Sequence, residues 1–278
     1  MTAHAPTLPL RSGGGIPAVG VGTSPLEGDE CFRQVMAALE AGYRLIDTAE
    51  NYRNEDAVGE AIRASGIDRS EIFVTTKLNR RWHSVAGVRE AFEASLRRLG
   101  VDYIDLLLVH WPNPDQDRYV DAVRGLQAIV ESGGLRALGT SNFKPAHLQR
   151  VLDETGITPD VNQIQLSPYS TRRDSREYHE AHAIVTQSWS PLGASSAELR
   201  SDPVVERIAA AHGRSPSQVV LRWHYQLGLA TIPRSSNPGR LAENLDIFGF
   251  ELSSAEMDAI GALDRGDAGI LDSDVFGH

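Results

Sequence analysis

Eight short strand-like runs alternate with helical segments along almost the whole chain, and this alternation limits the possible folds more than any other feature. The runs occupy residues 18–23, 43–48, 72–77, 102–110, 135–141, 161–166, 183–189 and 228–233. Several of them are apolar on both faces, as the strands of a parallel sheet between layers of helices are. The pattern therefore predicts an α/β fold built on a parallel sheet.

Apolar residues at helical spacing fill the segments between the runs. One set repeats along one face and is followed by Gly100, a typical helix-ending residue: Val88, Phe92, Leu96 and Leu99. Phe32, Val35 and Leu39 show the same spacing before Gly42. Residues 119–132 and residues 203–227 are also predicted to be helical.

Eight strands with intervening helices favour a closed (β/α)8 TIM barrel over an open doubly wound sheet. The open sheet would carry a glycine-rich phosphate turn after its first strand, whereas this chain has only Gly20 and Gly22 there. The length of 278 residues suits a barrel, which takes about 250. Residues 7–17 are expected to form an N-terminal hairpin, and residues 265–278 a short irregular C-terminal tail. Because no linker is seen, residues 1–278 are predicted to form one domain.

The composition is that of an ordinary globular protein with a surplus of acidic residues. Hydrophobic residues make up 41% of the chain, charged residues 23%, and the net charge is −10. Such a chain is a poor partner for nucleic acid or an anionic membrane, and no apolar run approaches the ~18 residues of a membrane span. Cys31 is the single cysteine, so no intrachain disulfide can form and a cytoplasmic location is expected. The first residues lack the pattern of a signal peptide.

Four chemically active side chains are predicted at or just after the ends of successive strands. Asp47 lies next to the end of one run, Lys77 and His110 are the last residues of two others, and Tyr52 follows Asp47 in a polar loop. Each residue alone has an ordinary structural explanation, such as a loop cap or a satisfied core histidine. In an α/β barrel, however, the carboxyl ends of the strands carry the active site. Their equivalent positions on neighbouring strands therefore point to one site.

The chemistry that these groups suit is proton donation. A tyrosine with an ordinary pKa of about 10 is a weak acid near neutral pH. An ammonium about 4 Å away favours the phenolate by roughly 4 kcal/mol at an effective dielectric constant near 20, which is about 3 pKa units. Lys77 is therefore expected to lower the pKa of Tyr52 and make it a general acid. Asp47 would keep Lys77 charged and in place, and His110 would orient the substrate oxygen.

Longer motifs around these residues carry a resemblance to a known family. They include GYRLIDTAENY, TTK, LLLVHWP, GTSNF, VNQIQLSPY, SWSPLG and IPRSSNPGRLAEN, in this order. On these motifs the chain resembles the aldo-keto reductases, NADPH-dependent carbonyl reductases on an (α/β)8 barrel, and most closely their bacterial 2,5-diketogluconate reductase-like branch. The resemblance implies a catalytic tetrad of Asp47, Tyr52, Lys77 and His110, with Tyr52 as the proton donor. It also implies a small-molecule carbonyl substrate and no metal.

The resemblance further implies a set of NADPH contacts spread along the chain: Gly22, Thr23, Ser141, Asn142, Gln163, Trp189, Ser190, Leu192, Gly193, Arg234, Ser235, Arg240, Glu243 and Asn244. Ser141, Asn142 and Gln163 would hold the nicotinamide carboxamide, and Trp189 would stack on the ring. Arg234 and Arg240 would bind the 2′-phosphate, because guanidinium groups suit a phosphate dianion. Without the resemblance, the Ser-Asn pair would be explained as a helix N-cap, the tryptophan as core packing and the arginines as solvated residues.

Several departures from the family pattern bear on the substrate. Ser24 and Asn79 stand where relatives commonly have aromatic residues, and Ser167 replaces a common histidine. The tail is also short. Together these features predict an open and rather polar substrate pocket, with Ser24 and Trp111 as substrate residues and Trp111 as its aromatic wall. Arg234 replaces a common lysine and keeps the charge, which leaves the preference for NADPH over NADH open.

Two other classes of function compete with the reductase. One is a nicotinamide-binding sensor or scaffold protein with little turnover, against which the complete tetrad argues. The other is a metal-dependent hydrolase that uses His110 and Asp47, although the first strand lacks the paired-histidine spacing of such enzymes. Relatives in this branch are commonly monomers, so a monomer is expected.

Overall fold

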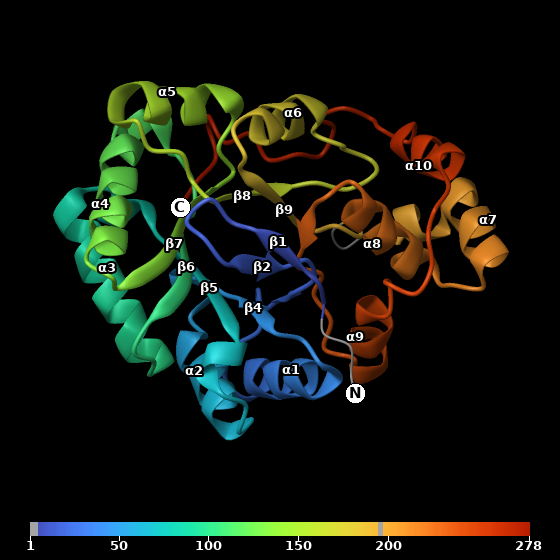
Figure 1. Ribbon diagram of the computed structural model, residues 1–278, viewed down its shortest axis with the longest axis horizontal. Coiled ribbons are helices and arrows are strands. Elements are labelled where there is room, and N and C mark those ends of the chain that lie inside the picture. Colours follow the sequence, from blue (N-terminus) through green and yellow to red (C-terminus); the bar gives the residue numbers. More distant parts are fainter. Residues whose placement is uncertain (1–4, 194–196) are drawn as a thin grey trace.

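Eight parallel strands form a barrel at the centre of the protein, as the sequence predicts (Figure 1). This computed structural model describes residues 5–193 and 197–278. The barrel strands are β3 (Val21–Gly22), β4 (Leu45–Asp47), β5 (Phe73–Leu78), β6 (Ile104–Val109), β7 (Leu135–Ser141), β8 (Val161–Gln165), β9 (Val185–Trp189) and β10 (Ala230–Thr231). They pair in chain order, and a parallel bridge between Val19 and Thr231 brings the first and last strands together.

Helices surround the strands as an outer ring (Figure 1). They are α1 (Gly28–Ala41), α2 (Glu55–Ala64), α3 (Val85–Leu99), α4 (Tyr119–Glu131), α5 (Pro145–Thr155), α6 (Arg173–Ala181), α7 (Pro203–His212), α8 (Pro216–Gln226), α9 (Pro238–Leu245) and α10 (Ser254–Gly261). The predicted stop at Gly100 is confirmed, because this residue ends α3 with a left-handed φ of 63°. Among the described residues, no helix has the length and apolar character needed to cross a membrane.

The prediction of one continuous helical segment over residues 203–227 is wrong, because two helices, α7 and α8, occupy this range. Gly213 ends α7 with a left-handed φ of 60°. Ser215 then begins α8 with a capping box, and Pro216 occupies its first turn. The apolar pattern continues through the break because Val205 and Ile208 of α7 lie in one buried cluster with Val219 and Trp223 of α8.

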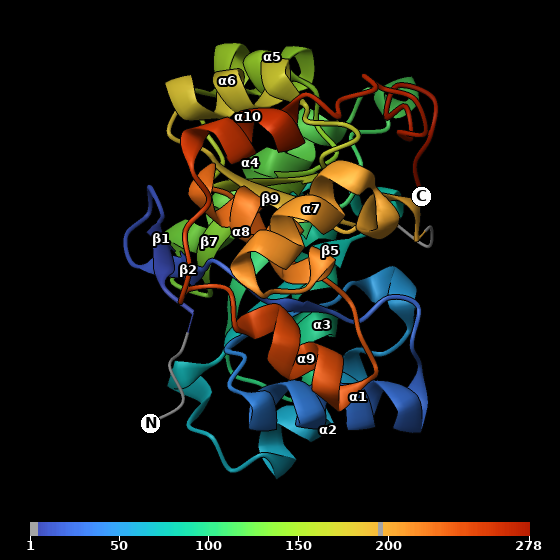
Figure 2. The same ribbon diagram turned by 90° about the vertical axis from the view of Figure 1, so that its right-hand side faces the viewer.

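The predicted N-terminal hairpin is present, and it closes one end of the barrel. Its strands β1 (Thr7–Pro9) and β2 (Gly15–Pro17) are antiparallel. Ile16 is fully buried and packs in one cluster with Leu45, Leu106 and Leu108 from the barrel strands. The hairpin therefore covers the amino-terminal ends of the strands. In Figure 2 it lies on the opposite side of the molecule from the C-terminus.

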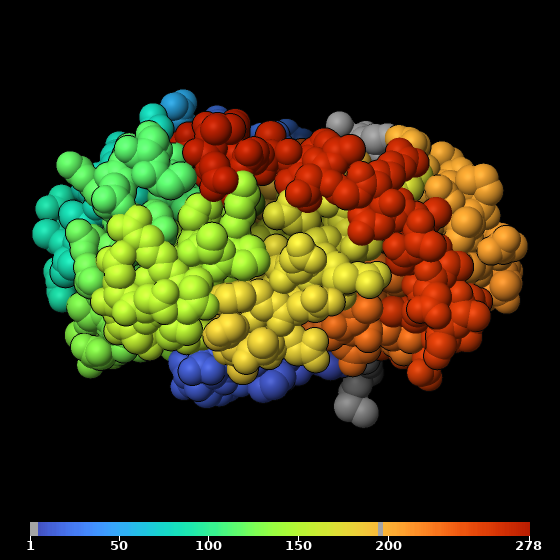
Figure 3. Space-filling model, turned by 90° about the horizontal axis from the view of Figure 1, so that it is seen from above, coloured from blue at the N-terminus to red at the C-terminus, as the bar shows by residue number. Residues whose placement is uncertain are grey.

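The C-terminal tail, residues 265–278, crosses the other end of the barrel (Figures 2 and 3). It contains no helix or strand, as predicted. Lys144, just after β7, holds it through Asp272 at 2.6 Å and Asp274 at 2.5 Å. The Gln165 side chain at the end of β8 donates to the backbone oxygen of Gly269 at 3.2 Å. The tail is thus fastened over the carboxyl ends of the strands, where a barrel places its active site.

Buried hydrogen bonds fix His179 as a neutral imidazole between the barrel and α6. Asn162 Nδ2 donates to the Phe143 carbonyl oxygen and lies 2.9 Å from His179 Nε2. The Asn162 oxygen accepts from Thr140 at 2.9 Å, so the amide orientation is set and His179 Nε2 must be the acceptor. His179 Nδ1 then donates to the Thr186 hydroxyl at 2.8 Å. Burial lowers the pKa of His179 to about 3.

These buried neutral histidines predict a loss of stability in mild acid. Burial also lowers the pKa of His224 to about 4, from a usual 6.5. The unfolded chain therefore binds more protons than the folded protein between about pH 6.5 and about pH 4, and the free energy of unfolding falls as the pH falls through this window. Each histidine contributes up to about 1.4 kcal/mol per pH unit.

Urea titrations at about pH 7 and about pH 5 measure this slope. His179→Gln removes one titrating group while it keeps hydrogen-bonding capacity, so the variant should show a shallower slope than the wild type. Equal slopes in the two proteins would contradict the assignment of His179 as a buried neutral group.

Candidate active site

The ends of three adjacent strands bring the predicted catalytic residues together. Asp47 is the last residue of β4, Lys77 is next to last in β5, and His110 directly follows β6. In the parallel register Asp47 pairs with Thr75 and Lys77 with Leu108, so the three strands end at one level. Tyr52 approaches from the short 3-10 helix η1 (Glu50–Tyr52) that follows β4. The tetrad is therefore one cluster in space.

A buried ion pair forms the base of this cluster. Lys77 Nζ lies 2.5 Å from Asp47 Oδ1 and donates to the Thr48 carbonyl oxygen at 2.9 Å. Both Lys77 and Asp47 are 1% exposed. Burial opposes the charge of Lys77, but the Asp47 carboxylate and the Tyr52 phenol outweigh it and raise the pKa of Lys77. Lys77 is thus held as an ammonium inside the barrel.

Tyr52 lies beside both Lys77 and His110. Lys77 Nζ is 5.1 Å from the centroid of the Tyr52 ring, and the rings of Tyr52 and His110 meet edge to face at 5.7 Å. The expected net lowering of the Tyr52 pKa is wrong. Burial raises the pKa of Tyr52 more than Lys77 lowers it. The prediction from the sequence considered the charge of the ammonium but not the loss of water around the phenol, which disfavours the phenolate.

His110 is a neutral imidazole at the upper edge of the cluster. It is 5% exposed. Burial, with smaller contributions from Lys77 and His278, places the pKa of His110 well below its usual value. Its Nδ1 has no hydrogen-bond partner among the described residues. A neutral ring can donate one hydrogen bond to a bound oxygen without adding a charge.

The residues predicted to hold the nicotinamide form a connected patch beside the tetrad. Trp189 Nε1 donates to Asn142 Oδ1 at 2.9 Å, and Asn142 Nδ2 donates to Ser141 Oγ at 3.1 Å. Gln163 joins this patch to the tetrad, because its Nε2 donates to Asp47 Oδ2 at 2.7 Å. The same nitrogen donates to Gln187 at 2.6 Å, so only the Gln163 oxygen is left for a ligand.

Gln187, which is completely buried in β9, was not among the residues predicted from the sequence. Its Nε2 has no partner among the described residues, although its oxygen accepts from Gln163. A glutamine that faces the inside of a barrel is an unusual choice for a packed core. The one signal for Gln187 in the sequence was its long polar side chain within the strand-like run at 183–189.

The segments predicted to bind phosphate lie near α9 and the ends of β3 and β9. Gln34 of α1 joins two of them, because its Nε2 donates to the backbone oxygens of Gly22 and Ser235, each at 3.1 Å. Arg234 and Arg240 are exposed, and neither forms an ion pair within the described residues. Two unpaired guanidiniums at the start of a helix, in an acidic chain, suit an anionic group.

The remaining predicted cofactor residues lie in α9 and in the turn after β9. Glu243 accepts a short hydrogen bond from Ser215, and Asn244 is buried in α9. Ser190, Leu192 and Gly193 form the turn after β9. The next three residues, 194–196, lie outside the described part of the chain.

The expectation of an open substrate pocket is wrong. The Phe276 ring meets Trp111 at 4.8 Å, and the His278 ring lies 4.9 Å from His110. Trp111 is consequently 3% exposed. Ser24 is half-buried next to Thr23, whose hydroxyl donates to the backbone oxygen of Asp47 at 3.0 Å. Phe276 and His278 of the tail thus cover the site, although the family's usual aromatic residues are missing at Ser24 and Asn79.

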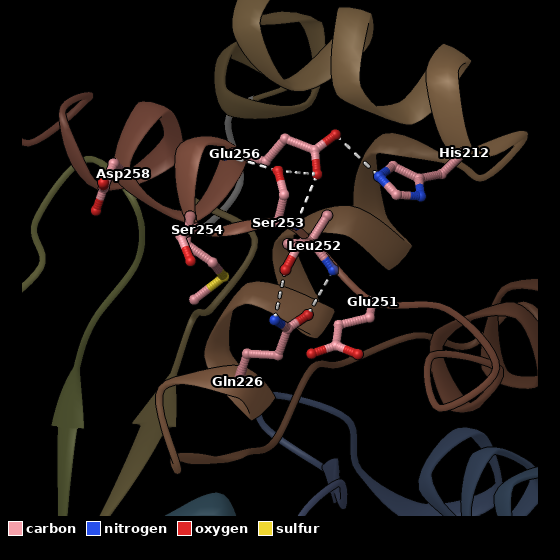
Figure 4. Close-up of a pocket in the computed structure, with 9 residues that line it drawn as sticks. His212, Gln226, Glu251, Leu252, Ser253, Ser254, Glu256 and Asp258 are labelled. Carbon is pink, nitrogen blue, oxygen red and sulfur yellow. Dashed lines mark hydrogen bonds and ion pairs between the residues drawn. The ribbon is translucent and has the colours of Figure 1, made fainter.

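A surface hollow of about 800 Å³ lies outside the barrel, between α7, α8 and the start of α10 (Figure 4). Its polar groups bond to one another. His212 Nε2 lies 2.9 Å from Glu256 Oε1, and the Gln226 side chain both donates to and accepts from the Leu252 backbone. No tetrad residue lines it. These bonds attach the segment that contains Leu252 and Glu256 to α7 and α8, and they do not converge on a ligand position.

Comparisons with known proteins show the family of the chain. The sequence model described as the Aldo/keto reductase family matches residues 14–265. The chain is 46% identical over 263 residues to 2,5-diketo-D-gluconic acid reductase B of Corynebacterium sp. (strain SHS752001), with 95% of each chain covered. It is 48% identical over 264 residues to an aldo-keto reductase of Mycolicibacterium smegmatis, with 95% of this chain and 93% of that one covered.

Solved structures show the same likeness. An aldo/keto reductase from Brucella melitensis superposes with a TM-score of 0.90 at 43% identity, and the match covers 94% of this chain and 100% of that one. A mutant of Gox0644 in complex with NADPH superposes with a TM-score of 0.94 at 41% identity, covering 99% of this chain and 100% of that one.

Proposed function

We propose that this chain, which belongs to the aldo/keto reductase family and is an NADPH-dependent oxidoreductase, reduces aldehydes and ketones to alcohols with Tyr52 as the proton donor. The observation that carries the proposal is the buried Lys77–Asp47 ion pair beside the Tyr52 ring. NADPH, when bound, supplies the hydride. The residues of the chain then have to orient the carbonyl group and deliver a proton to its oxygen.

Proton delivery from Tyr52 remains favourable although its pKa is raised. The acceptor is the oxygen of a forming alkoxide, which is a base of about the strength of hydroxide, and the pKa of water is about 15.7. A buried phenol is still a much stronger acid than the alcohol it creates. Lys77 limits the rise in the Tyr52 pKa and stabilises the phenolate that remains. That phenolate regains a proton from solvent.

The other members of the tetrad position the reacting groups. Asp47 fixes Lys77, and Gln163 in turn holds the second carboxylate oxygen of Asp47. Neutral His110 would hydrogen-bond the carbonyl oxygen and orient it toward Tyr52. Because His110 carries no charge near neutral pH, it does not repel Lys77.

The cofactor would extend from the nicotinamide patch to α9. Ser141 and Asn142 offer polar groups for the carboxamide, and half-buried Trp189 offers a ring face. Arg234 and Arg240 are the proposed 2′-phosphate contacts. We also propose a cytoplasmic location, for which the single cysteine, Cys31, gives support because it is buried and free. A monomer is proposed as well.

Replacement of both arginines should weaken NADPH use selectively. Each lost guanidinium–phosphate contact costs about 1.5–3 kcal/mol, so the KM for NADPH in Arg234→Ala/Arg240→Ala should rise at least about tenfold. The KM for NADH should change little, because NADH lacks the 2′-phosphate. Steady-state rates with each cofactor measure the effect.

Arg207→Ala, which removes an exposed arginine from α7, is the matched control and should leave both constants unchanged. Equal losses for NADPH and NADH in the double variant would place the 2′-phosphate elsewhere.

The proposed function is tested by NADPH oxidation with a panel of α-dicarbonyls, hydroxyaldehydes, aromatic aldehydes and ketones. Wild-type turnover that depends on Tyr52 supports it. NADPH binding without turnover of any carbonyl compound would favour a sensor instead.

A further inference from the structure

Gln187 lies inside the barrel, directly beside the proposed nicotinamide contact Gln163. The two glutamines are partners in the parallel register of β8 and β9, which run side by side (Figure 1). Val161 and Val185 come two residues earlier on the same strands, and both pack in the apolar cluster of the barrel interior. Since side chains two residues apart point to one face of a strand, both glutamines face inward, one layer nearer to the carboxyl ends of the strands.

The Asp47 carboxylate and Gln187 together determine which way the Gln163 amide points. Gln163 Nε2 donates to Asp47 Oδ2 at 2.7 Å and to Gln187 Oε1 at 2.6 Å. An amide nitrogen carries two hydrogens, so both are used. With the amide reversed, the Gln163 oxygen would face two oxygen acceptors, and neither bond could form. The arrangement therefore leaves the Gln163 oxygen as the atom that a bound group can reach.

The other side-chain oxygens of the nicotinamide patch already accept hydrogen bonds. Asn142 Oδ1 accepts from Trp189 Nε1 at 2.9 Å, and Ser141 Oγ accepts from Asn142 Nδ2 at 3.1 Å. The side-chain oxygen of Gln163 accepts no bond within the described residues. Because the NH2 group of a carboxamide is a donor, this oxygen is the natural acceptor for it. The orientation of one amide thus decides how well the site recognises the carboxamide.

The chemistry of Gln187 fits a role in orientation and not in packing. Its Nε2 has no partner among the described residues, and a buried donor without a partner is costly. Leucine would fill a similar space inside a barrel without that cost. The useful atom of Gln187 is therefore its oxygen, whose one hydrogen bond in the described part of the chain comes from Gln163.

We infer that Gln187 is a positioning residue for the nicotinamide ring, because it holds the Gln163 amide with its nitrogen on Asp47 and its oxygen toward the carboxamide NH2 group. This inference rests on the cofactor site of the proposed function, and it adds a residue that acts through Gln163. The three side chains form one series of hydrogen bonds that links the tetrad to the nicotinamide patch.

A cofactor analogue tests this orientation directly. The acetylpyridine analogue of NADPH has a methyl group in place of the carboxamide NH2 group, so it cannot donate to Gln163. The wild-type protein should bind NADPH about three- to tenfold more tightly than the analogue, the range of one neutral hydrogen bond. In Gln187→Leu the Gln163 amide is free to turn, and the ratio of the two dissociation constants should fall toward unity. Quenching of tryptophan fluorescence measures both constants without any carbonyl compound.

Two further variants separate orientation from a structural role. Gln187→Glu still offers an oxygen acceptor in either protonation state, and it should keep the wild-type ratio. Gln187→Met keeps the length of the side chain but has only a weak sulfur acceptor, so it should lose the ratio and serves if leucine does not fit. A purely structural role would weaken the binding of both cofactors alike and leave the ratio unchanged in every variant.

Gln226→Leu is the matched control. Gln226 bonds to the Leu252 backbone in the surface hollow (Figure 4). Its replacement removes the hydrogen bonds of a glutamine away from the tetrad, so it should keep the ratio even if it lowers the free energy of unfolding.

The outcomes distinguish this inference from the proposed function. An unchanged ratio in both Gln187→Leu and Gln187→Met overturns the inference alone. A wild-type protein that binds NADPH and the analogue equally well would remove Gln163 as the carboxamide contact, and the inference with it. A wild-type protein that discriminates between the two cofactors but reduces no carbonyl compound overturns the proposed reductase and leaves the role of Gln187 in place.

Discussion

Tyr52→Phe is expected to lower kcat for carbonyl reduction by about 10²–10⁴, the usual contribution of a positioned proton donor. The substitution removes one hydroxyl group and keeps the ring that packs edge-on against His110. Without this proton source, the forming alkoxide must take a proton from water in a site where the neighbouring groups are almost fully buried. Single-turnover measurements with NADPH and glyceraldehyde isolate the chemical step from product release.

NADPH affinity should not change in Tyr52→Phe, since the proposed cofactor contacts lie on other strands. Quenching of tryptophan fluorescence on NADPH addition measures that affinity. Tyr178→Phe removes a hydroxyl whose one hydrogen bond within the described residues is to Gln149 on an outer helix, and it should retain full activity. Near-native rates in Tyr52→Phe with every accepted carbonyl compound would end the assignment of Tyr52 as proton donor.

Lys77→Met is expected to cause the largest loss of stability of any variant considered, together with a loss of activity. It leaves the Asp47 carboxylate 1% exposed and without its counter-ion. Removing one partner of a buried pair typically costs about 3–5 kcal/mol. Urea titration near neutral pH measures the free energy of unfolding.

The double variant Asp47→Asn/Lys77→Met separates stability from catalysis. It removes both charges, so much of the lost stability should return. Its activity should stay low, because no ammonium remains to stabilise a Tyr52 phenolate. If the double variant instead regained activity, Lys77 would have only a structural role.

An exposed ion pair supplies the control for the buried one. Arg124 and Asp121 are 2.7 Å apart on α4, with side chains 42% and 51% exposed. Arg124→Met should change the free energy of unfolding by less than about 1 kcal/mol, as is usual for surface pairs. A Lys77→Met variant no less stable than Arg124→Met would show that the buried pair contributes little.

The barrel and the tetrad were predictable because both depend on local sequence patterns. Each strand shows its own apolar run, and parallel strands that pair in chain order end at one level. A polar residue at the end of each run must then meet its neighbours, as Asp47, Lys77 and His110 do. The hairpin over residues 7–17 was found in the same way from its glycines and prolines.

The predictions that were wrong concern the surroundings of these residues. The fall in the Tyr52 pKa was derived from one neighbouring charge, and burial reversed its direction. The open pocket was derived from missing aromatic residues near Ser24 and Asn79, whereas Phe276 and His278 cover the site from the far end of the chain. Desolvation and long-range contact depend on everything that packs around a group, which no local motif records.

The sequence by itself determined which side chains stand at the ends of the strands and, through them, the kind of chemistry this protein can perform. Only the tertiary structure decided how dry these side chains are and which segment lies above them. Strand and helix patterns are set by neighbours a few residues apart, so they can be recognised in the sequence. The position of His278 over His110 is set by weak contacts between the tail and the barrel loops, among them those of Gln165 with Gly269 and of Arg80 with His278. These contacts exist only once the barrel has closed.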